Sequence, residues 1–137
     1  MAAVLPASKV GSLQRVGSKY VTSYSTHWPC YFPQPGPGKK HERAIVLERW
    51  QEGLVDDEPR AFLRGLLHSD GCRVVNRVAG REYPRYMFTN YSQDIKALFT
   101  MVCDGLGVEW RPMGLNNIAV SRRASVRFLD EFVGPKY

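Results

Sequence analysis

The alternation of hydrophobic and polar residues near the N-terminus predicts a small element that is separate from the rest of the chain. Two short alternating stretches, residues 12–16 and 19–25, flank Gly17 and predict a β-hairpin. Residues 33–41 contain three prolines and two glycines, which remove hydrogen-bond donors and loosen the backbone, so they predict a linker or an extended crossing segment. We therefore expect a hairpin and a linker over residues 1–44.

The main domain is expected over residues 45–137, where helical and strand spacings follow one another. Apolar residues recur every three or four positions in three stretches, and they alternate with polar residues in two pairs of stretches. The expected elements are a short amphipathic piece at 45–51, a helix from the acids at 56–58 to His68, strands at 72–78 and 83–90, a helix at 93–106, strands at 108–112 and 117–120, and a helix that Ser121 caps and that ends near Phe132. This order, α-β-β-α-β-β-α, predicts an α+β fold in which helices cover one face of an antiparallel sheet and leave the other face open.

Comparison of the chain with itself indicates an internal repeat. Residues 11–25 and 107–121 share a layout of strand, glycine turn, strand and serine, and the similarity continues from 32–39 to 132–136. The repeat predicts that the first 40 or so residues are the tail of an earlier α-β-β-α-β-β-α unit. Because the identities are few, chance similarity is the alternative.

Composition narrows the class of protein. The 137 residues carry a net charge of +6, which is compatible with a polyanionic partner. No apolar run approaches the roughly 20 residues that would span a bilayer, so we expect no membrane partner. The three cysteines are widely separated and odd in number, which favours reduced thiols and a cytoplasmic location over a disulfide framework.

One nine-residue stretch carries the most specific signal. Residues 63–71 read Leu-Arg-Gly-Leu-Leu-His-Ser-Asp-Gly and resemble the LAGLIDADG signature of homing endonucleases, with identical residue types at its first, third, fourth, eighth and ninth positions. Residues 86–108 look like the second hairpin strand and middle helix of this family, and residues 121–136 are similar to the ends of actinobacterial LAGLIDADG-like proteins. The resemblance covers the chain from about His27 to its end.

The resemblance implies a magnesium-dependent endonuclease of double-stranded DNA, of the kind that serves intron homing. Two motif helices would pack side by side through small residues, here Gly65 and Ser69. The acid at the eighth position, Asp70, would be the catalytic residue and a Mg²⁺ ligand, with Gly71 in the same metal site. The open sheet would form a saddle in the major groove, where alternate side chains contact bases and phosphates.

Basic and amide side chains on the two expected hairpins suit such a saddle. Arginine and asparagine have the forked geometries that read guanine and adenine. The expected DNA-binding residues are Arg73, Arg77, Arg81 and Arg85 on the first hairpin, and Arg111, Asn116 and Asn117 on the second.

The sequence departs from the family pattern in two respects. The sixth motif position, which is often acidic, is His68, and the chain contains only one motif. A catalytic pair of acids would then require a homodimer or a second LAGLIDADG half. Two alternatives to an endonuclease stay open: a DNA-binding or transcription-regulatory module that does not cleave, and a degenerate, inactive fragment.

Overall fold

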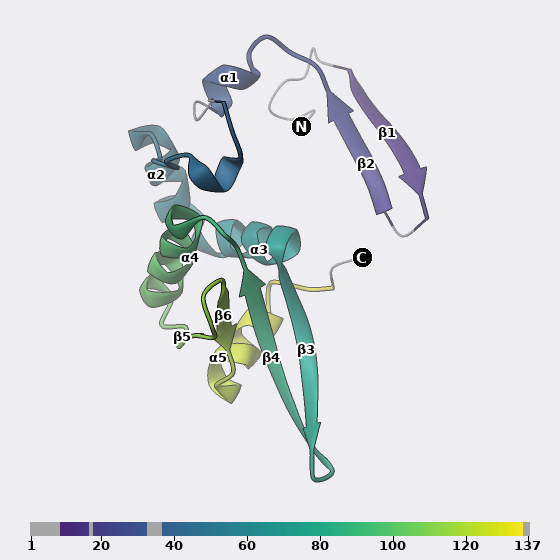
Figure 1. Ribbon diagram of the computed structural model, residues 1–137, viewed down its shortest axis with the longest axis vertical. Coiled ribbons are helices and arrows are strands. Elements are labelled where there is room, and N and C mark those ends of the chain that lie inside the picture. The colour runs from purple at the N-terminus through teal and green to yellow at the C-terminus, as the bar shows by residue number, and fades with distance from the viewer. Residues whose placement is uncertain (1–8, 17, 33–36, 136–137) are drawn as a thin grey trace. The chain divides into compact units, whose positions relative to one another are not determined.

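The computed structural model describes residues 9–16, 18–32 and 37–135, and it divides the chain into two compact units, 1–37 and 38–137 (Figure 1). We describe each unit by itself. The division falls before the boundary at residue 44 that we expected from the sequence. Lys40–Glu42 form a short 3₁₀ turn, η1, and the Ile45 N–H donates a hydrogen bond of 2.7 Å to the Asp94 carboxylate of the second unit. Residues 33–36 of the linker that we expected at 33–41 lie outside the described residues.

The first unit contains the expected hairpin and a short helix. Strand β1 (Val10–Arg15) pairs antiparallel with β2 (Ser18–Ser23), which confirms the hairpin. Helix α1 (Trp28–Tyr31), which we did not predict, follows. Its Trp28 indole Nε1 donates to the carbonyl oxygen of Ser23 at 3.1 Å, and the indole ring centre lies 5.8 Å from that of Phe32. The hydrogen bond to Ser23 joins the helix to the end of β2.

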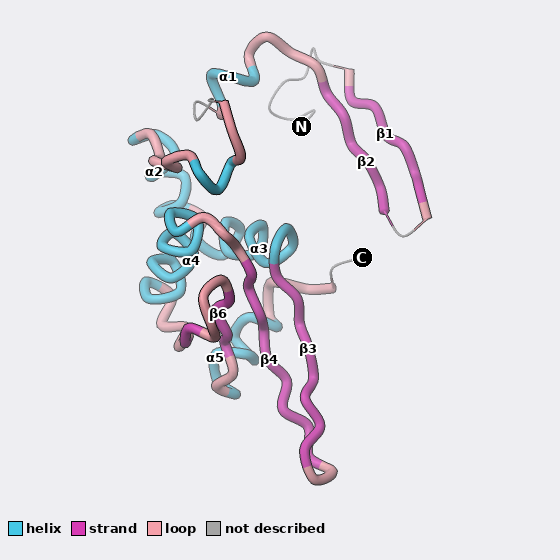
Figure 2. Tube along the Cα trace, in the orientation of Figure 1, coloured by secondary structure: helices cyan, strands magenta, loops and turns pink. Residues whose placement is uncertain are grey.

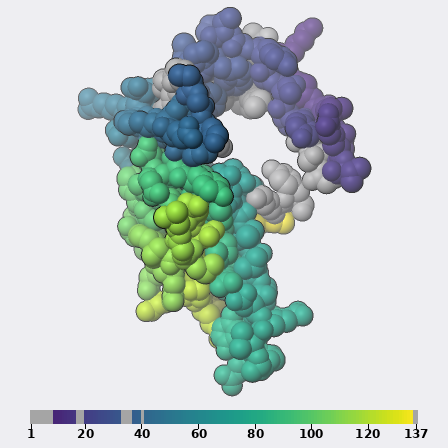
Figure 3. Space-filling model, viewed as in Figure 1, coloured from purple at the N-terminus to yellow at the C-terminus, as the bar shows by residue number. Residues whose placement is uncertain are grey.

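The second unit confirms the α+β fold with an antiparallel sheet (Figure 2). Its elements are α2 (Arg49–Asp57), α3 (Pro59–Asp70), β3 (Gly71–Val78), β4 (Arg81–Thr89), α4 (Gln93–Gly105), β5 (Arg111–Pro112), β6 (Asn117–Val120) and α5 (Arg123–Asp130). From α3 onward the order is α-β-β-α-β-β-α, and the strands lie in the order β3-β4-β6-β5. The tip of the β3-β4 hairpin projects from the body of this unit (Figure 3).

One face of the four-stranded sheet packs against the helices. Phe88 lies opposite both Gly71 and Ile118 in the strand register, and its ring stacks on Phe99 of α4 with ring centres 4.3 Å apart. Phe88, Ile118 and Val120 on this face are almost fully withdrawn from water, and such burial contributes about 1.5–3 kcal/mol per side chain. The buried core comprises Val55, Leu63, Leu67, Tyr86, Phe88, Phe99, Val102, Cys103, Val108, Ile118, Val120, Val126, Leu129 and Val133.

Two helix boundaries differ from our expectation, and one agrees. The acids at 56–57 end α2 instead of opening α3. Helix α2 itself begins after Glu48, whose N–H donates to the Gln51 side chain at 3.0 Å in a capping box. The Ser121 cap is wrong: Arg122 is the N-cap residue of α5, and it makes no side-chain capping bond. Asn90 and Ser92 were both candidate caps of α4, and Ser92 is the cap, since its hydroxyl accepts from the Ile95 N–H at 3.4 Å.

Candidate nucleic-acid interface

The sheet has a second face that points away from the core, and we call it the open face. Directly opposed residues of antiparallel strands point to the same side, so the register assigns every strand residue to a face. Tyr86 and Phe88 face the helices, and their neighbours along β4 therefore point the other way. The polar side chains on the open face are Asn76, Arg81, Tyr83, Arg85, Thr89, Arg111 and Asn117.

The open face carries positive charge and no acid within the described strands. The only acid in the four strands is Glu82, which lies opposite Arg77 on the face that bears the core. Its carboxylate oxygen is 2.9 Å from an Arg77 Nη2 atom, so these two charges offset each other. The open face therefore presents three arginines with no carboxylate among them, and this arrangement raises the local concentration of anions.

Cross-strand hydrogen bonds orient several of these polar groups. The Arg85 guanidinium is half-buried, and its Nη2 donates to the Asn76 Oδ1 at 3.2 Å. The Thr89 hydroxyl donates to the Asn117 Oδ1 at 2.6 Å. Each amide keeps its Nδ2 donors for another acceptor, and the guanidinium is held before any ligand arrives. Orientation of this kind reduces the side-chain entropy that is lost when a ligand binds.

The structure separates the expected DNA-binding residues into three groups. Arg81, Arg85, Arg111 and Asn117 share the open face, with Arg81 next to the hairpin turn and Arg111 on the edge strand β5. Arg73 and Arg77 lie on the opposite face, where each has a carboxylate partner. Asn116 lies in the turn before β6, and its carbonyl oxygen accepts from the Asn90 N–H at 2.9 Å.

We did not single out Asn76, Tyr83 and Thr89 as binding residues from the sequence, although the structure adds them to the open face. The alternation along residues 72–78 places Asn76 on the side opposite Arg73 and Arg77. It did not show which side faced water, because apolar residues occur at both parities of the first strand. The buried pair Tyr86 and Phe88 decides the question.

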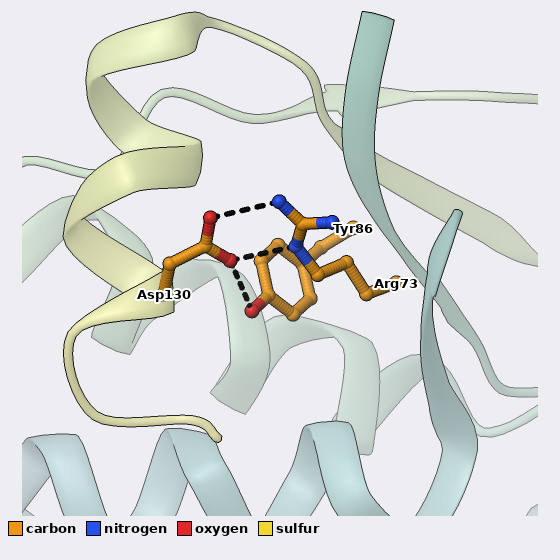
Figure 4. A network of polar contacts seen from close by, with 3 residues as sticks. All are labelled: Arg73, Tyr86 and Asp130. Atoms are coloured by element: carbon orange, nitrogen blue, oxygen red, sulfur yellow. Dashed lines mark hydrogen bonds and ion pairs between the residues drawn. The ribbon is translucent and has the colours of Figure 1, made fainter. Parts of the chain in front are cut away.

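Arg73, Tyr86 and Asp130 form a network of polar contacts that holds the Arg73 side chain in place (Figure 4). Its Nε and Nη2 donate to the two oxygens of Asp130 at 2.7 and 2.9 Å, and the Tyr86 hydroxyl donates to the same carboxylate at 2.7 Å. Hydrogen bonding to Arg73 lowers the pKa of Asp130, and the same bond raises the pKa of Arg73. Desolvation, followed by the bond to Asp130, raises the pKa of Tyr86. This network joins α5 to β3 and β4, which gives Arg73 a structural role.

A cavity of about 420 Å³ adjoins this network. Its lining includes Leu67 and His68 of α3 together with Val133 to Pro135 after α5. The His68 Nε2 lies 2.8 Å from the carbonyl oxygen of Val133, to which it donates. The histidine at the sixth motif position therefore joins the end of α3 to the C-terminal tail.

Asp70 is the last residue of α3, and its carboxylate is half-buried. Its Oδ2 accepts from the Asn90 Nδ2 at 3.0 Å and from the Ser69 hydroxyl at 3.2 Å. Asn90 is itself buried, and its Oδ1 accepts from the Ser92 N–H at 2.8 Å. A rigid amide thus orients the carboxylate, and sequence reasoning identified Asn90 only as a possible cap.

Gly71 allows the chain to pass from α3 directly into β3. A Cβ atom at this position would lie 2.8 Å from both the Leu67 Cδ2 and the Leu67 carbonyl oxygen, which is closer than real Cβ contacts. Glycine is therefore required by the close approach of the strand to the helix. The consequence is that Asp70 stays at the junction of the helix and the edge strand.

The outward surface of α3 carries small side chains at four-residue spacing, namely Ala61, Gly65 and Ser69, all exposed. A Cβ added at Gly65 would meet no heavy atom within 4 Å, so the fold of a single chain does not require glycine there. The Ser69 hydroxyl shares its single proton between the Leu66 carbonyl oxygen at 3.0 Å and the Asp70 Oδ2 at 3.2 Å, and it stays close to the helix surface. This surface can approach another helix closely.

Comparisons with models of protein families, with curated proteins and with solved structures find no match to this chain. Within the described ranges, no group of three or more His, Cys, Asp or Glu side chains converges to hold a metal ion. No helix in the described part of the chain is long and apolar enough to cross a membrane.

Proposed function

We propose that the chain is a LAGLIDADG-type protein that binds double-stranded DNA on the open face of its sheet and hydrolyses phosphodiester bonds as a dimer. One observation carries the proposal: Arg81, Arg85 and Arg111 share this face, and no acid of the described strands accompanies them. Phosphate contacts from arginine dominate the affinity of such surfaces, and oriented amides add base contacts. The element order and the strand order β3-β4-β6-β5 are compatible with a homing-endonuclease-like unit.

Asp70 is the proposed catalytic residue, and its surroundings support that role. The donor set is suitable for Mg²⁺, because carboxylate and main-chain carbonyl oxygens are the hard ligands that this ion prefers. Asp70 would hold the ion through its carboxylate and Gly71 through its main-chain oxygen. Bound Mg²⁺ would supply Lewis acidity and an activated water for phosphodiester hydrolysis. Asn90 keeps the Asp70 carboxylate in one orientation through the 3.0 Å hydrogen bond.

A nicking assay on duplex DNA with and without Mg²⁺ tests this role. Asp70→Asn should remove nicking while DNA affinity stays within about twofold, because the arginines of the open face are untouched. Glu109→Gln, which changes an exposed acid elsewhere, should leave both properties unchanged. If the Asp70→Asn protein still nicks the duplex, the catalytic assignment fails.

Dimerisation through α3 is proposed because one chain supplies one Asp70. Gly65→Leu should shift the protein from dimer to monomer in sedimentation experiments, since a branched side chain would separate two closely packed helices. The free energy of unfolding of the monomer should change little, because no heavy atom lies within 4 Å of the added Cβ. An unchanged dimer would contradict this interface.

A DNA-binding module that does not cleave is the second candidate. It is favoured by the single carboxylate that each chain brings to the helix end and by the absence of a converging acid cluster in the residues that the structure covers. Salt-sensitive duplex binding without Mg²⁺-dependent nicking would establish this candidate in place of the endonuclease.

A further inference from the structure

The first unit has a charge composition that differs from the rest of the chain. Residues 1–37 contain three basic residues, Lys9, Arg15 and Lys19, and no Asp or Glu, whereas all 13 acids of the chain follow. No carboxylate within this unit can therefore neutralise Arg15. The positive charge of the unit would attract a polyanion and would not attract a basic partner.

Aromatic side chains lie beside this charge. In the β1-β2 register Leu13 lies opposite Tyr20 and Arg15 opposite Ser18, so Leu13, Arg15 and Tyr20 share one face of the hairpin. The Arg15 guanidinium carbon lies 5.2 Å from the centre of the Tyr20 ring, within the range of a cation–π contact. Tyr20 is 52% exposed, and Tyr24, which follows the end of β2, is 88% exposed.

This combination of exposed aromatic rings and positive charge suits a single-stranded nucleic acid better than a duplex. Aromatic rings bind nucleic acid by stacking on the faces of bases, and those faces are accessible in a single strand but hidden in a duplex. Tyr20 and Tyr24 are separated by four residues of extended chain, or roughly 13 Å at about 3.3 Å per residue, so they can contact different bases. Trp28 fixes the segment after Tyr24 through its 3.1 Å hydrogen bond to Ser23.

We propose that the first unit is a second nucleic-acid-binding element, which binds single-stranded DNA by stacking bases on Tyr20 and Tyr24 while Arg15 contacts phosphate. This element is independent of the duplex-binding open face and does not rest on the nuclease assignment. The alternative ligand is a protein with an apolar surface. It would contact the same exposed side chains, but leucine in place of tyrosine would serve it equally well.

The test uses the full chain and a fluorescently labelled thymidine oligonucleotide longer than the roughly 4–16 nucleotides that one small single-strand-binding module covers. The double variant Tyr20→Leu/Tyr24→Leu should weaken binding by about tenfold or more, because it keeps apolar bulk and removes the stacking rings. Tyr20→Phe/Tyr24→Phe keeps the rings and should bind like the unaltered chain. This matched pair separates stacking from loss of the hairpin.

Two further arms complete the experiment. Arg15→Gln should reduce the dependence of binding on salt between about 50 and 200 mM, because one phosphate contact is lost, whereas Arg15→Lys should preserve it. Arg81→Gln/Arg111→Gln should weaken duplex binding and leave binding of the thymidine oligonucleotide unchanged. The proposal is overturned if the unaltered chain does not bind the oligonucleotide, or if the Leu and Phe double variants bind it equally. Failure of duplex nicking would bear only on the nuclease assignment.

Discussion

The two faces of the β3-β4 hairpin use the same residue type for opposite purposes. Arg73 and Arg77 lie on the face that bears the core, and each has a carboxylate oxygen within 3 Å, at 2.7 Å from Asp130 and 2.9 Å from Glu82. Arg81 and Arg85 belong to the same hairpin but lie on the open face, where the described strands hold no acid. Moving an arginine by one position along a strand therefore places it on the other face, so that an arginine paired with a carboxylate becomes one whose charge is available to a ligand.

The comparison also holds for uncharged residues. Tyr86 and Phe88 of β4 are 4% and 0% exposed, whereas Tyr83 of the same strand is 45% exposed on the other face. Burial of one set of alternating side chains fixes the register, because a slip of one residue would expose Phe88 and bury Arg85. The apolar core thus determines which polar groups the open face presents. Substitutions on the two faces should have distinct effects.

The largest expected effect is on stability. Phe88→Ala should lower the free energy of unfolding by about 3–5 kcal/mol, because it leaves a cavity beside Phe99 in the core. Its neighbour Met87 points to the open face and is half-buried, so Met87→Ala should cost clearly less. Urea unfolding of both variants measures the difference. Equal losses would mean that the two faces are not distinguished as the register indicates.

The next largest effect is expected on duplex binding. The triple variant Arg81→Gln/Arg85→Gln/Arg111→Gln should reduce the slope of log affinity against log salt by roughly 2.7, since each phosphate contact contributes about 0.9. Affinity should fall by well over tenfold at low salt. Fluorescence anisotropy with labelled duplex at several salt concentrations provides the measurement.

The control for this experiment is Arg77→Gln, which removes an exposed arginine of the same hairpin from the opposite face. It lowers the net charge by one but should leave the salt slope close to that of the unaltered chain. A slope that depends only on the number of arginines removed would show that net charge, and not the open face, is responsible for binding.

The sequence was sufficient for the order of elements after residue 58, because each helix and strand there has a clear apolar period and a turn at its end. Helix α2 was harder to predict, because acids at 56–58 are typical of a helix start and unfavourable at a helix end, and yet residues 56 and 57 end α2. Its capping box at Glu48 and Gln51 was the available signal. Local patterns therefore predicted elements better than boundaries.

The candidate site was only partly predictable, for a physical reason. A sequence motif identified Asp70 and Gly71 as candidates, and the number of arginines on one hairpin identified the basic residues. The partner of Arg73 could not be predicted from the sequence, because Asp130 lies 57 residues away and is brought to it by the packing of α5. Charges become available or neutralised through such long-range contacts, which no local pattern encodes.

The smallest expected effect concerns the Arg73–Asp130 pair, whose side chains are 41% and 35% exposed. Asp130→Asn should lower the free energy of unfolding by about 1 kcal/mol near pH 7, since exposure to solvent screens the pair. The pKa of Asp130 is lowered in the folded chain by its hydrogen bonds from Arg73 and Tyr86. The unfolded chain therefore binds more protons in the acid range, and stability falls as pH decreases.

This contribution of Asp130 is fully present above about pH 5, well above the unfolded pKa near 3.9, and it is lost progressively as the pH falls towards the lower pKa of the folded chain. The Asp130→Asn protein should therefore match the unaltered chain at low pH and differ from it only near neutrality. Urea unfolding between pH 3 and pH 7 measures this convergence, with Glu82→Gln as the control for the more exposed pair. A difference that persists undiminished at low pH would show that Asp130 stabilises α5 by packing or neutral hydrogen bonding and that its charge is not required.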